Sequence, residues 1–337
     1  METATQTEQI IDTTAPLMTA LEITSPKQIT VKHIPLPEPA DDEVRIKMEG
    51  CGLCASNLPV WEGREWFTYP VQAGNPGHEG WGVVDAIGKN VTDYQPGERV
   101  AAITFNAFAE YDVTKASNLI RLPAELNDVP FPAEPLGCAM NIFDRSDIRA
   151  GQTIAIIGVG FLGALLVQLA HSAGAKVIAL ARKDSALNLA KELGADEVIK
   201  LDDHWQIIEK VKELTNGNFC ERVIEATGKQ WPLDLAAELT AVRGKLIIAG
   251  YHQDGMRQVN VQLWNWRGID VINAHERDPE EYLKGMRNAV QAVKDGVITP
   301  QRLLTHVFSA TDLQKAFETH HQNPEGFVKA LITFNNR

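Results

Sequence analysis

The pattern of apolar and polar positions changes character along the chain. From about residue 18 to residue 133, short apolar stretches such as 44–48 and 82–88 are broken at frequent intervals by Pro and Gly. Alternation with a period of two, bounded by turn residues, is typical of half-buried strands. This part of the chain is therefore predicted to be a mostly antiparallel β domain.

After Pro135, buried strands and helices alternate. Apolar runs predict strands at 153–157, 176–181, 223–226 and 245–249, and helical patterns occupy 162–173, 184–193 and 231–240. Strands that alternate with helices indicate a parallel, doubly wound sheet. The chain is therefore expected to combine an α/β unit with the β-rich unit.

The pattern changes again near Pro279. A helix at 280–294 is followed by an apolar stretch at 303–308, a helix at 311–321 and a last strand at 328–334. A strand this late suits a return to the first sheet. We therefore expect one domain from 18–136 and 279–337 and a second from 137–278. The polar segment 1–17 is expected to be a flexible extension.

Composition narrows the classes of protein that fit. The 337 residues are 44% apolar and 23% charged, which is ordinary for a globular protein. A net charge of −12 argues against a nucleic-acid or anionic-membrane partner. No apolar run reaches the roughly 18 to 20 residues that span a bilayer, and the N-terminus lacks a signal-peptide pattern. Four cysteines are too few for a disulfide framework, so a cytoplasmic location is expected.

A glycine-rich turn carries the first chemical signal. Gly158, Gly160 and Gly163 match G-x-G-x-x-G directly after a predicted strand and at the start of a predicted helix. Such glycines permit a tight turn, close approach of pyrophosphate and close helix–strand packing. With its βαβ context, this turn predicts dinucleotide binding. The candidate cofactor residues are Gly158, Gly160, Phe161, Leu162, Gly163, Ala181, Arg182, Lys183, Thr227 and Gly250.

The end of the second strand bears on which dinucleotide binds. An NAD site usually places an acid there for the ribose hydroxyls, but this strand ends at Ala181 and continues into Arg182 and Lys183. A guanidinium suits a 2′-phosphate. NADP(H) is therefore the preferred cofactor and NAD(H) the possible one. In the alternative interpretation, the two basic residues are solvated positions before a helix.

Cys54 and His78 provide the second chemical signal. Thiolate and imidazole are ligands that zinc prefers, and a catalytic zinc keeps three protein ligands and one open position. A lone histidine is more often a core residue, so the interpretation of His78 as a metal ligand requires further ligands nearby.

Further candidate ligands follow from a resemblance to a known family. The stretches 52–56, 77–80, 96–100 and 134–136, followed by the glycine turn, resemble those of zinc-dependent medium-chain dehydrogenases, closest to the polyol (sorbitol-type) and threonine dehydrogenase branch. The resemblance implies a GroES-like catalytic domain, a Rossmann domain and an active site in the cleft between them. It also implies a homodimer or homotetramer, one catalytic zinc, and hydride transfer between the cofactor and a secondary alcohol or ketone, expected to be a polyol or sugar-like compound.

The resemblance also assigns roles to individual residues. Cys54 and His78 would bind the zinc. Glu79 would be a direct ligand or a nearby carboxylate, and Glu134 would be the third ligand or a carboxylate bonded to the zinc-bound water. Ser56 would take the proton of the substrate hydroxyl.

Several positions depart from the family pattern. Asn57 stands where relatives usually carry Asp, and Pro59 stands where many carry a His that continues the proton relay. His275 is one candidate substitute for that relay. The segment after Val100 lacks the four cysteines of a structural zinc lobe. Arg64, in the aromatic stretch 61–69, is a candidate substrate contact.

Two other functions remain open from the sequence. A nonzinc quinone or enoyl reductase would keep the glycine turn without needing Cys54, His78, Glu79 and Glu134. A noncatalytic nucleotide-binding relative is the alternative outside enzymology. The zinc content of the protein discriminates among these possibilities.

Overall fold

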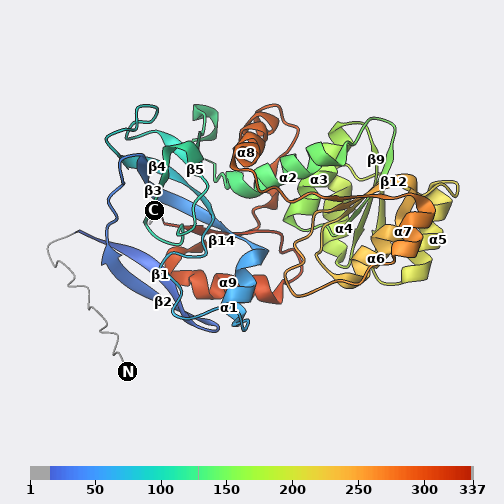
Figure 1. Ribbon diagram of the computed structural model, residues 1–337, viewed down its shortest axis with the longest axis horizontal. Helices are drawn as coiled ribbons and strands as arrows, with labels where there is room; N and C mark the ends of the chain where they lie inside the picture. Colours follow the sequence, from blue (N-terminus) through green and yellow to red (C-terminus); the bar gives the residue numbers. More distant parts are fainter. Residues whose placement is uncertain (1–15, 128, 335–337) are drawn as a thin grey trace, which may run out of the picture.

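The computed structural model describes residues 16–127 and 129–334. The predicted N-terminal extension therefore lies almost entirely outside the described residues. Two large β-sheets occupy opposite ends of an elongated molecule (Figure 1). Among the described residues, no helix combines the length and apolarity that crossing a membrane requires.

One large sheet has seven strands and is mostly antiparallel. Its main path runs β14-β15-β3-β4-β5-β7, and β6 pairs with β3. In β3, Val44, Ile46 and Met48 are buried between more exposed polar neighbours, as the period-two pattern predicts. The strands are β3 (Glu43–Leu53), β4 (Glu79–Ile87), β5 (Arg99–Ala102), β6 (Tyr111–Lys115), β7 (Leu119–Arg121), β14 (His306–Ser309) and β15 (Ala330–Thr333). A separate hairpin joins β1 (Leu17–Ser25) to β2 (Gln28–Pro35).

The late strand does return to this sheet. β15 pairs antiparallel with β3, with Leu331 opposite Gly52. Residues almost 280 positions apart therefore share one ladder, which confirms the expectation from the last apolar run.

The second large sheet is parallel throughout. Its order is β10-β9-β8-β11-β12-β13, so the first strand in sequence lies beside the second and the fourth. This is the Rossmann order, and it confirms the predicted doubly wound sheet. The strands are β8 (Thr153–Ile157), β9 (Lys176–Ala181), β10 (Glu197–Lys200), β11 (Cys220–Glu225), β12 (Thr240–Ile248) and β13 (Asp270–Asn273). The associated helices are α3 (Phe161–Ser172), α4 (Asp184–Glu192), α5 (His204–Leu214), α6 (Gln230–Leu239) and α7 (Val261–Arg267).

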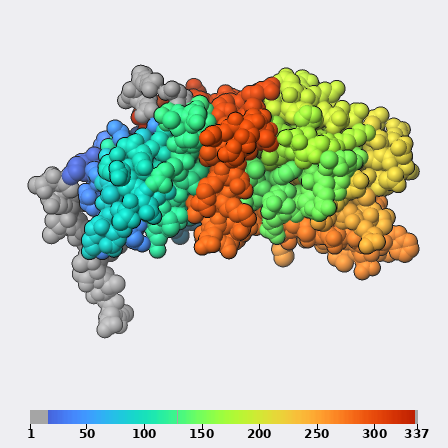
Figure 2. Space-filling model, turned by 90° about the horizontal axis from the view of Figure 1, so that it is seen from above, coloured from blue at the N-terminus to red at the C-terminus, as the bar shows by residue number. Residues whose placement is uncertain are grey.

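Two helices join the halves. α2 (Ala133–Ser146) and α8 (Pro279–Lys294) pack closely. Gly137 permits this approach, because a Cβ at that position would lie 2.8 Å from the Met286 backbone nitrogen. In the view from above, the band of residues that includes α8 lies between the two ends of the molecule (Figure 2). Since α2 runs through residues 136 and 137, the chain does not break at the predicted domain boundary, and the exact boundaries stay predictions.

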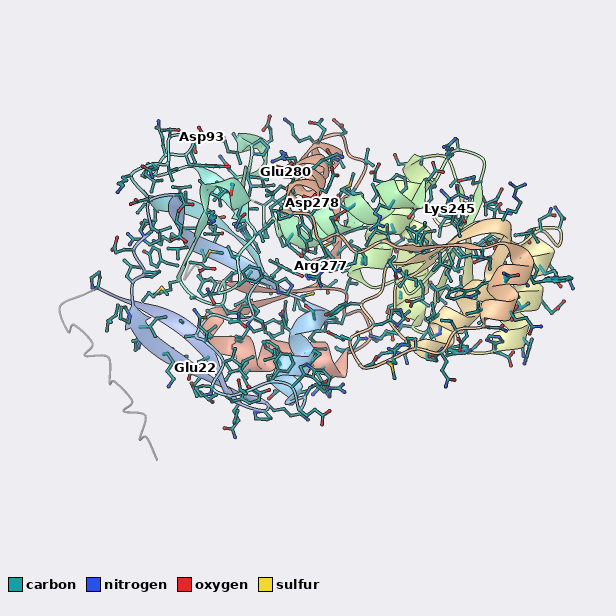
Figure 3. The ribbon with its side chains drawn as sticks, viewed as in Figure 1. Glu22, Asp93, Lys245, Arg277, Asp278 and Glu280 are labelled. Carbon is teal, nitrogen blue, oxygen red and sulfur yellow. The ribbon has the colours of Figure 1, made fainter. Side chains whose placement is uncertain are left out.

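Most of the remaining short elements lie around the seven-stranded sheet, whereas η4 (Pro300–Leu303) packs against α3. The others are α1 (Leu58–Glu62), α9 (Leu313–Gln322) and the 3₁₀ turns η1 (Ala55–Asn57), η2 (Ala116–Asn118), η3 (Ala124–Leu126) and η5 (Ala310–Asp312). Charged side chains cover both halves, from Glu22 on β1 to Lys245 on β12, and Arg277 and Asp278 mark the entry into α8 (Figure 3).

Candidate metal and nucleotide site

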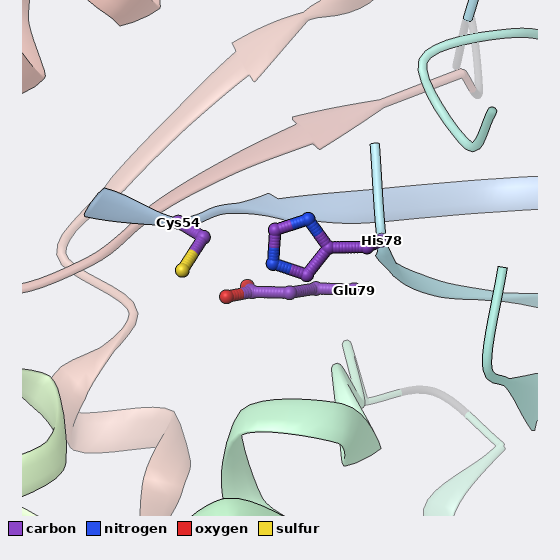
Figure 4. Close-up of side chains that lie close together, drawn as sticks. All are labelled: Cys54, His78 and Glu79. Atoms are coloured by element: carbon purple, nitrogen blue, oxygen red, sulfur yellow. The ribbon is translucent and has the colours of Figure 1, made fainter. Parts of the chain in front are cut away.

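Strand register brings the candidate zinc ligands together. Gly52 of β3 lies opposite Glu79, the first residue of β4. Cys54, just beyond β3, and His78, just before β4, therefore lie at the same end of the ladder. The potential ligand atoms of Cys54, His78 and Glu79 all lie within 4.8 Å of one another. Figure 4 shows the three side chains pointing toward one another.

The donor set fits a zinc ion. Thiolate, imidazole and carboxylate are all ordinary ligands of catalytic zinc. Gly52 helps to form the site, because a Cβ at that position would lie 1.9 Å from Glu79 Oε2. Only a residue without a side chain leaves room there for the buried carboxylate.

Asn57 links the segment that carries Cys54 to the segment that carries His78. Its Oδ1 accepts a hydrogen bond from the Cys54 backbone N–H at 2.9 Å, and its Nδ2 donates to Pro76 O at 3.0 Å. His78 Nδ1 also lies 2.9 Å from Pro76 O, and since a carbonyl only accepts, Nδ1 must donate. The imidazole therefore presents Nε2 as its ligand atom.

The charge of His78 depends on Cys54. Burial alone would lower the pKa of His78, but the hydrogen bond and negative charge of Cys54, aided by Glu134 and Glu79, raise that pKa to about 10. In the metal-free protein His78 is therefore an imidazolium near neutral pH. Binding of a metal would release the imidazolium proton.

Glu79 is also paired with a cation that the sequence analysis did not single out. Lys329 Nζ donates to Glu79 Oε1 at 2.6 Å and lies 2.5 Å from Oε2, and both side chains are buried. The Lys329 ammonium therefore pairs with both oxygens of the buried Glu79 carboxylate. The sequence does offer a signal for this residue, because Lys329 is a lone charged residue inside the last apolar run, just before β15.

Glu134 has a different set of partners. It lies in the first turn of α2 and accepts a hydrogen bond from the Tyr282 hydroxyl of α8. Cys138 Sγ lies 3.6 Å from the same carboxylate oxygen and 3.2 Å from Tyr282 Oη. Burial raises the pKa of Glu134. Glu134 is not in the compact group formed by Cys54, His78 and Glu79.

The other candidate catalytic residues are dispersed. Ser56 lies in η1, two residues after Cys54, and is partly exposed. His275 follows β13 and stacks on Tyr251 with ring centroids 5.9 Å apart, and its carbonyl accepts a hydrogen bond from Arg145. Arg64 is exposed and pairs with Glu62. The zinc-site group thus includes neither His275 nor Arg64.

The glycine turn has the geometry that a nucleotide needs. Gly158 follows β8 with a φ of 100°, and Gly160 is the N-cap of α3, where Phe161 and Leu162 begin the helix. A Cβ on Gly163 would lie 1.9 Å from Gly158 O, which explains the third glycine. The free N–H groups at the start of α3 form a phosphate site.

A buried carboxylate accepts hydrogen bonds from the loops that follow the neighbouring strands. Glu225, at the end of β11, accepts hydrogen bonds from the N–H groups of Thr227 and Gly228 at 2.6 and 3.0 Å. Its other oxygen lies 3.0 Å from His252 Nε2. A Cβ on Gly250 would lie 2.8 Å from the same oxygen, so Thr227 and Gly250 both pack at this carboxyl edge. The sequence analysis included these two residues but not Glu225.

The basic pair after β9 is divided between two environments. Ala181 is buried and Arg182 is exposed. Lys183 Nζ instead donates to Asn323 and Pro324, which follow α9. Only Arg182 is thus presented freely at the expected ribose end of the nucleotide site.

Known proteins match this chain over both halves. The family model described as "Alcohol dehydrogenase GroES-like domain" matches residues 40–124, and the one described as "Zinc-binding dehydrogenase" matches residues 162–300. Together they cover more than half of the chain. A sorbitol dehydrogenase of Halalkalibacterium halodurans is 26% identical, covering 90% of this chain and 95% of the relative. An L-threonine 3-dehydrogenase of Bacillus velezensis is 27% identical, with 89% and 94% covered.

A solved structure agrees with these matches. A zinc-binding dehydrogenase of Sinorhizobium meliloti, bound to NADP, superposes with a TM-score of 0.82 at 26% identity, covering 94% of this chain and 99% of that one. The chain belongs to the zinc-type medium-chain dehydrogenases of the polyol and threonine dehydrogenase branch. It is an oxidoreductase that acts on an alcohol with a nicotinamide cofactor.

Proposed function

We propose that this protein is a zinc-dependent oxidoreductase that transfers hydride between NADP(H) and a secondary alcohol or ketone of the polyol or sugar-like class. The observation that carries the proposal is the convergence of Cys54, His78 and Glu79 within 4.8 Å. A nonzinc reductase would have no need for a cysteine, a histidine and a buried carboxylate converging at one point. The names of the sorbitol and threonine dehydrogenase relatives support a hydroxyl-bearing substrate.

Cys54, His78 and Glu79 would hold the zinc, which when bound acts as a Lewis acid on the substrate oxygen. We place Glu79 rather than Glu134 as the third ligand, because Glu79 belongs to the compact group with Cys54 and His78 and Glu134 does not. Tyr282 directs the Glu134 carboxylate through a hydrogen bond. Glu134 would then be the carboxylate that lies beside the reacting hydroxyl and does not bind the zinc.

Ser56 would receive the hydroxyl proton at its Oγ. Its place two residues after Cys54 and its partial exposure suit a group between the substrate and solvent. Pro59 is buried in α1 and has no proton to exchange. The proton route therefore leaves Ser56 for solvent or the cofactor ribose, with His275 as a more distant candidate.

The preference for NADP(H) rests on Ala181 and Arg182. No acid is present at the end of β9 to bind the ribose hydroxyls, and an exposed guanidinium can bind a 2′-phosphate. We also propose a homodimer or homotetramer with no nucleic-acid or membrane partner, and a cytoplasmic location. The negative net charge supports the absence of polyanionic partners.

The test combines metal analysis with a substrate screen on one purified sample. Polyols, sugars and simple ketones are assayed with NADP(H) and NAD(H), and zinc is counted per chain. We expect about one zinc per chain, as in single-site members, and polyol-dependent reduction of NADP. Substoichiometric zinc with no alcohol-dependent change in absorbance would instead favour a noncatalytic nucleotide-binding protein. Metal-independent reduction of quinones or enoyl compounds would favour the nonzinc reductase.

A further inference from the structure

A loop of the seven-stranded half reaches the nucleotide edge of the parallel sheet. Residues 323–326, in the connection from α9 to β15, lie against residues 183–185, where β9 leads into α4. Lys183 Nζ donates to Asn323 O at 2.5 Å, to Asn323 Oδ1 at 2.6 Å and to Pro324 O at 2.8 Å. All three ammonium protons are thus used to hold the loop.

This loop places the charged residue Glu325 beside Ser185, at the start of α4. Glu325 Oε1 accepts a hydrogen bond from the Ser185 backbone N–H at 2.7 Å, and the Gly326 N–H donates to Ser185 Oγ at 3.1 Å. The hydrogen bonds from Ser185, with the charge of Lys183, lower the pKa of Glu325. An ionised carboxylate is therefore fixed at the first turn of α4.

This position matters because of where a Rossmann fold binds the adenosine ribose. The discriminating residue lies about 20 positions after the glycine turn, at the end of the second strand. Here that place is Ala181, Arg182 and Lys183. Asp184, directly after this place, is paired with Lys200. Glu325 supplies a further anion nearby, from more than 140 positions later in the chain and from the other half of the molecule.

A carboxylate at this corner treats the two cofactors differently. A ribose 2′-hydroxyl is neutral and can donate a hydrogen bond, whereas a 2′-phosphate brings up to two negative charges at neutral pH. The phosphate gains from Arg182 but is repelled by Glu325. Lys183 does not offset that repulsion freely, because its protons are committed to Asn323 and Pro324.

We propose that Glu325 is a specificity-determining residue for the cofactor. It disfavours the 2′-phosphate and so reduces the preference for NADP(H) over NAD(H) that Arg182 creates. Lys183 is the positioning residue that keeps the loop in place. This inference rests on the nicotinamide dinucleotide site of the proposed function, and it extends that site to a second element of the chain.

The test measures binding of NADPH and NADH to the full-length protein by quenching of tryptophan fluorescence. Glu325→Gln keeps the side-chain shape and removes its charge. The dissociation constant for NADPH should fall about three- to tenfold, and that for NADH should change by less than about twofold. Glu325→Lys should shift the ratio further in the same direction. Glu318→Gln, an exposed site on α9, controls for net charge and should leave the ratio unchanged.

Equal effects on both nucleotides, or no effect in either Glu325 variant, would overturn the role of Glu325. Arg182→Ala distinguishes this result from a failure of the proposed NADP(H) preference. If Arg182→Ala weakens both nucleotides equally while Glu325→Gln still shifts the ratio, the preference is wrong and the role of Glu325 stands. If only Arg182→Ala shifts the ratio, the preference stands and Glu325 has no part in it.

Discussion

Two regions of the molecule differ in how they bind their ligands. We call the strand ends around Cys54, His78 and Glu79 the metal end, and the glycine turn with the end of β9 the nucleotide edge. At the metal end, Cys54, His78, Glu79 and Lys329 bring functional side chains together at the ends of three adjacent strands. At the nucleotide edge, the glycine turn offers mainly backbone N–H groups, and the charged side chains Arg182 and Glu325 are exposed.

Burial explains the contrast. A charge inside the protein must be paired, so the metal end carries its own compensating cation, Lys329. An exposed charge is screened by water and contributes less. Changes at the metal end should therefore be severe and nearly all-or-none, whereas changes at the nucleotide edge should be graded.

Cys54→Ser should have the largest effect on activity. Loss of the thiolate should release zinc and lower turnover about 1,000-fold or more, since the metal contributes several kcal/mol to the barrier. NADPH binding should stay within about twofold, because the nucleotide edge lies on the other sheet. Zinc analysis, turnover and fluorescence titration check the three parts. Turnover near that of the unmodified protein would refute the metal assignment.

Lys329→Met should have the largest effect on stability. It leaves the Glu79 carboxylate buried without its cation, which should lower the free energy of unfolding by about 3–5 kcal/mol. Urea unfolding of chelator-treated protein measures the change. Lys329→Arg keeps the charge and should lose much less. Adding Glu79→Gln to Lys329→Met should recover part of the loss, and a purely additive double variant would argue against the ion pair.

Two glycines offer a matched comparison of the regions. A Cβ at Gly52 or at Gly163 would meet an oxygen at 1.9 Å, but the first oxygen belongs to Glu79 and the second to the backbone of Gly158. Gly52→Ala should lower the zinc content and spare NADPH binding. Gly163→Ala should retain zinc, weaken NADPH binding and lower the free energy of unfolding by about 1–3 kcal/mol, a typical cost of overpacking. If either variant impaired both sites equally, the two regions would not be independent.

The smallest effect concerns a neighbour of the metal end. Burial, with the charge of Lys329, lowers the pKa of His320 on α9 to about 3, and its Nδ1 has no hydrogen-bond partner among the described residues. The unfolded chain takes up this proton first, so stability is fully present above about pH 6.5 and falls as the pH drops toward 3.

The slope attributable to His320 should be at most about 1.4 kcal/mol per pH unit, and smaller near pH 6.5, where the histidine of the unfolded chain is only partly protonated. Urea unfolding between pH 7 and pH 5 measures it. His320→Gln should flatten this dependence, whereas His33→Gln, at an exposed site on β2, serves as the control. An unchanged slope in His320→Gln would remove the buried histidine from the explanation.

The local elements were largely readable from the sequence. β8 and β9 coincide with the predicted runs, and the helix starts after the glycine turn within one residue of the prediction. Three elements of the α/β half, β10, α5 and α7, were missed. The first is a four-residue edge strand, and neither β10 nor α7 contains a fully buried residue. Edge strands lose one neighbour and with it the continuous apolar signal.

The sequence by itself determined the two structural styles, the glycine turn and the candidates Cys54, His78 and Glu79. Each of these depends on local periodicity or on a short motif, and such signals lie within a few residues. Only the tertiary structure decided which distant groups surround them. Lys329 meets Glu79, Tyr282 meets Glu134 and Glu325 meets Ser185 across 140 or more positions. Those contacts follow from strand register and helix packing, which bring together parts of the chain that carry no shared sequence pattern.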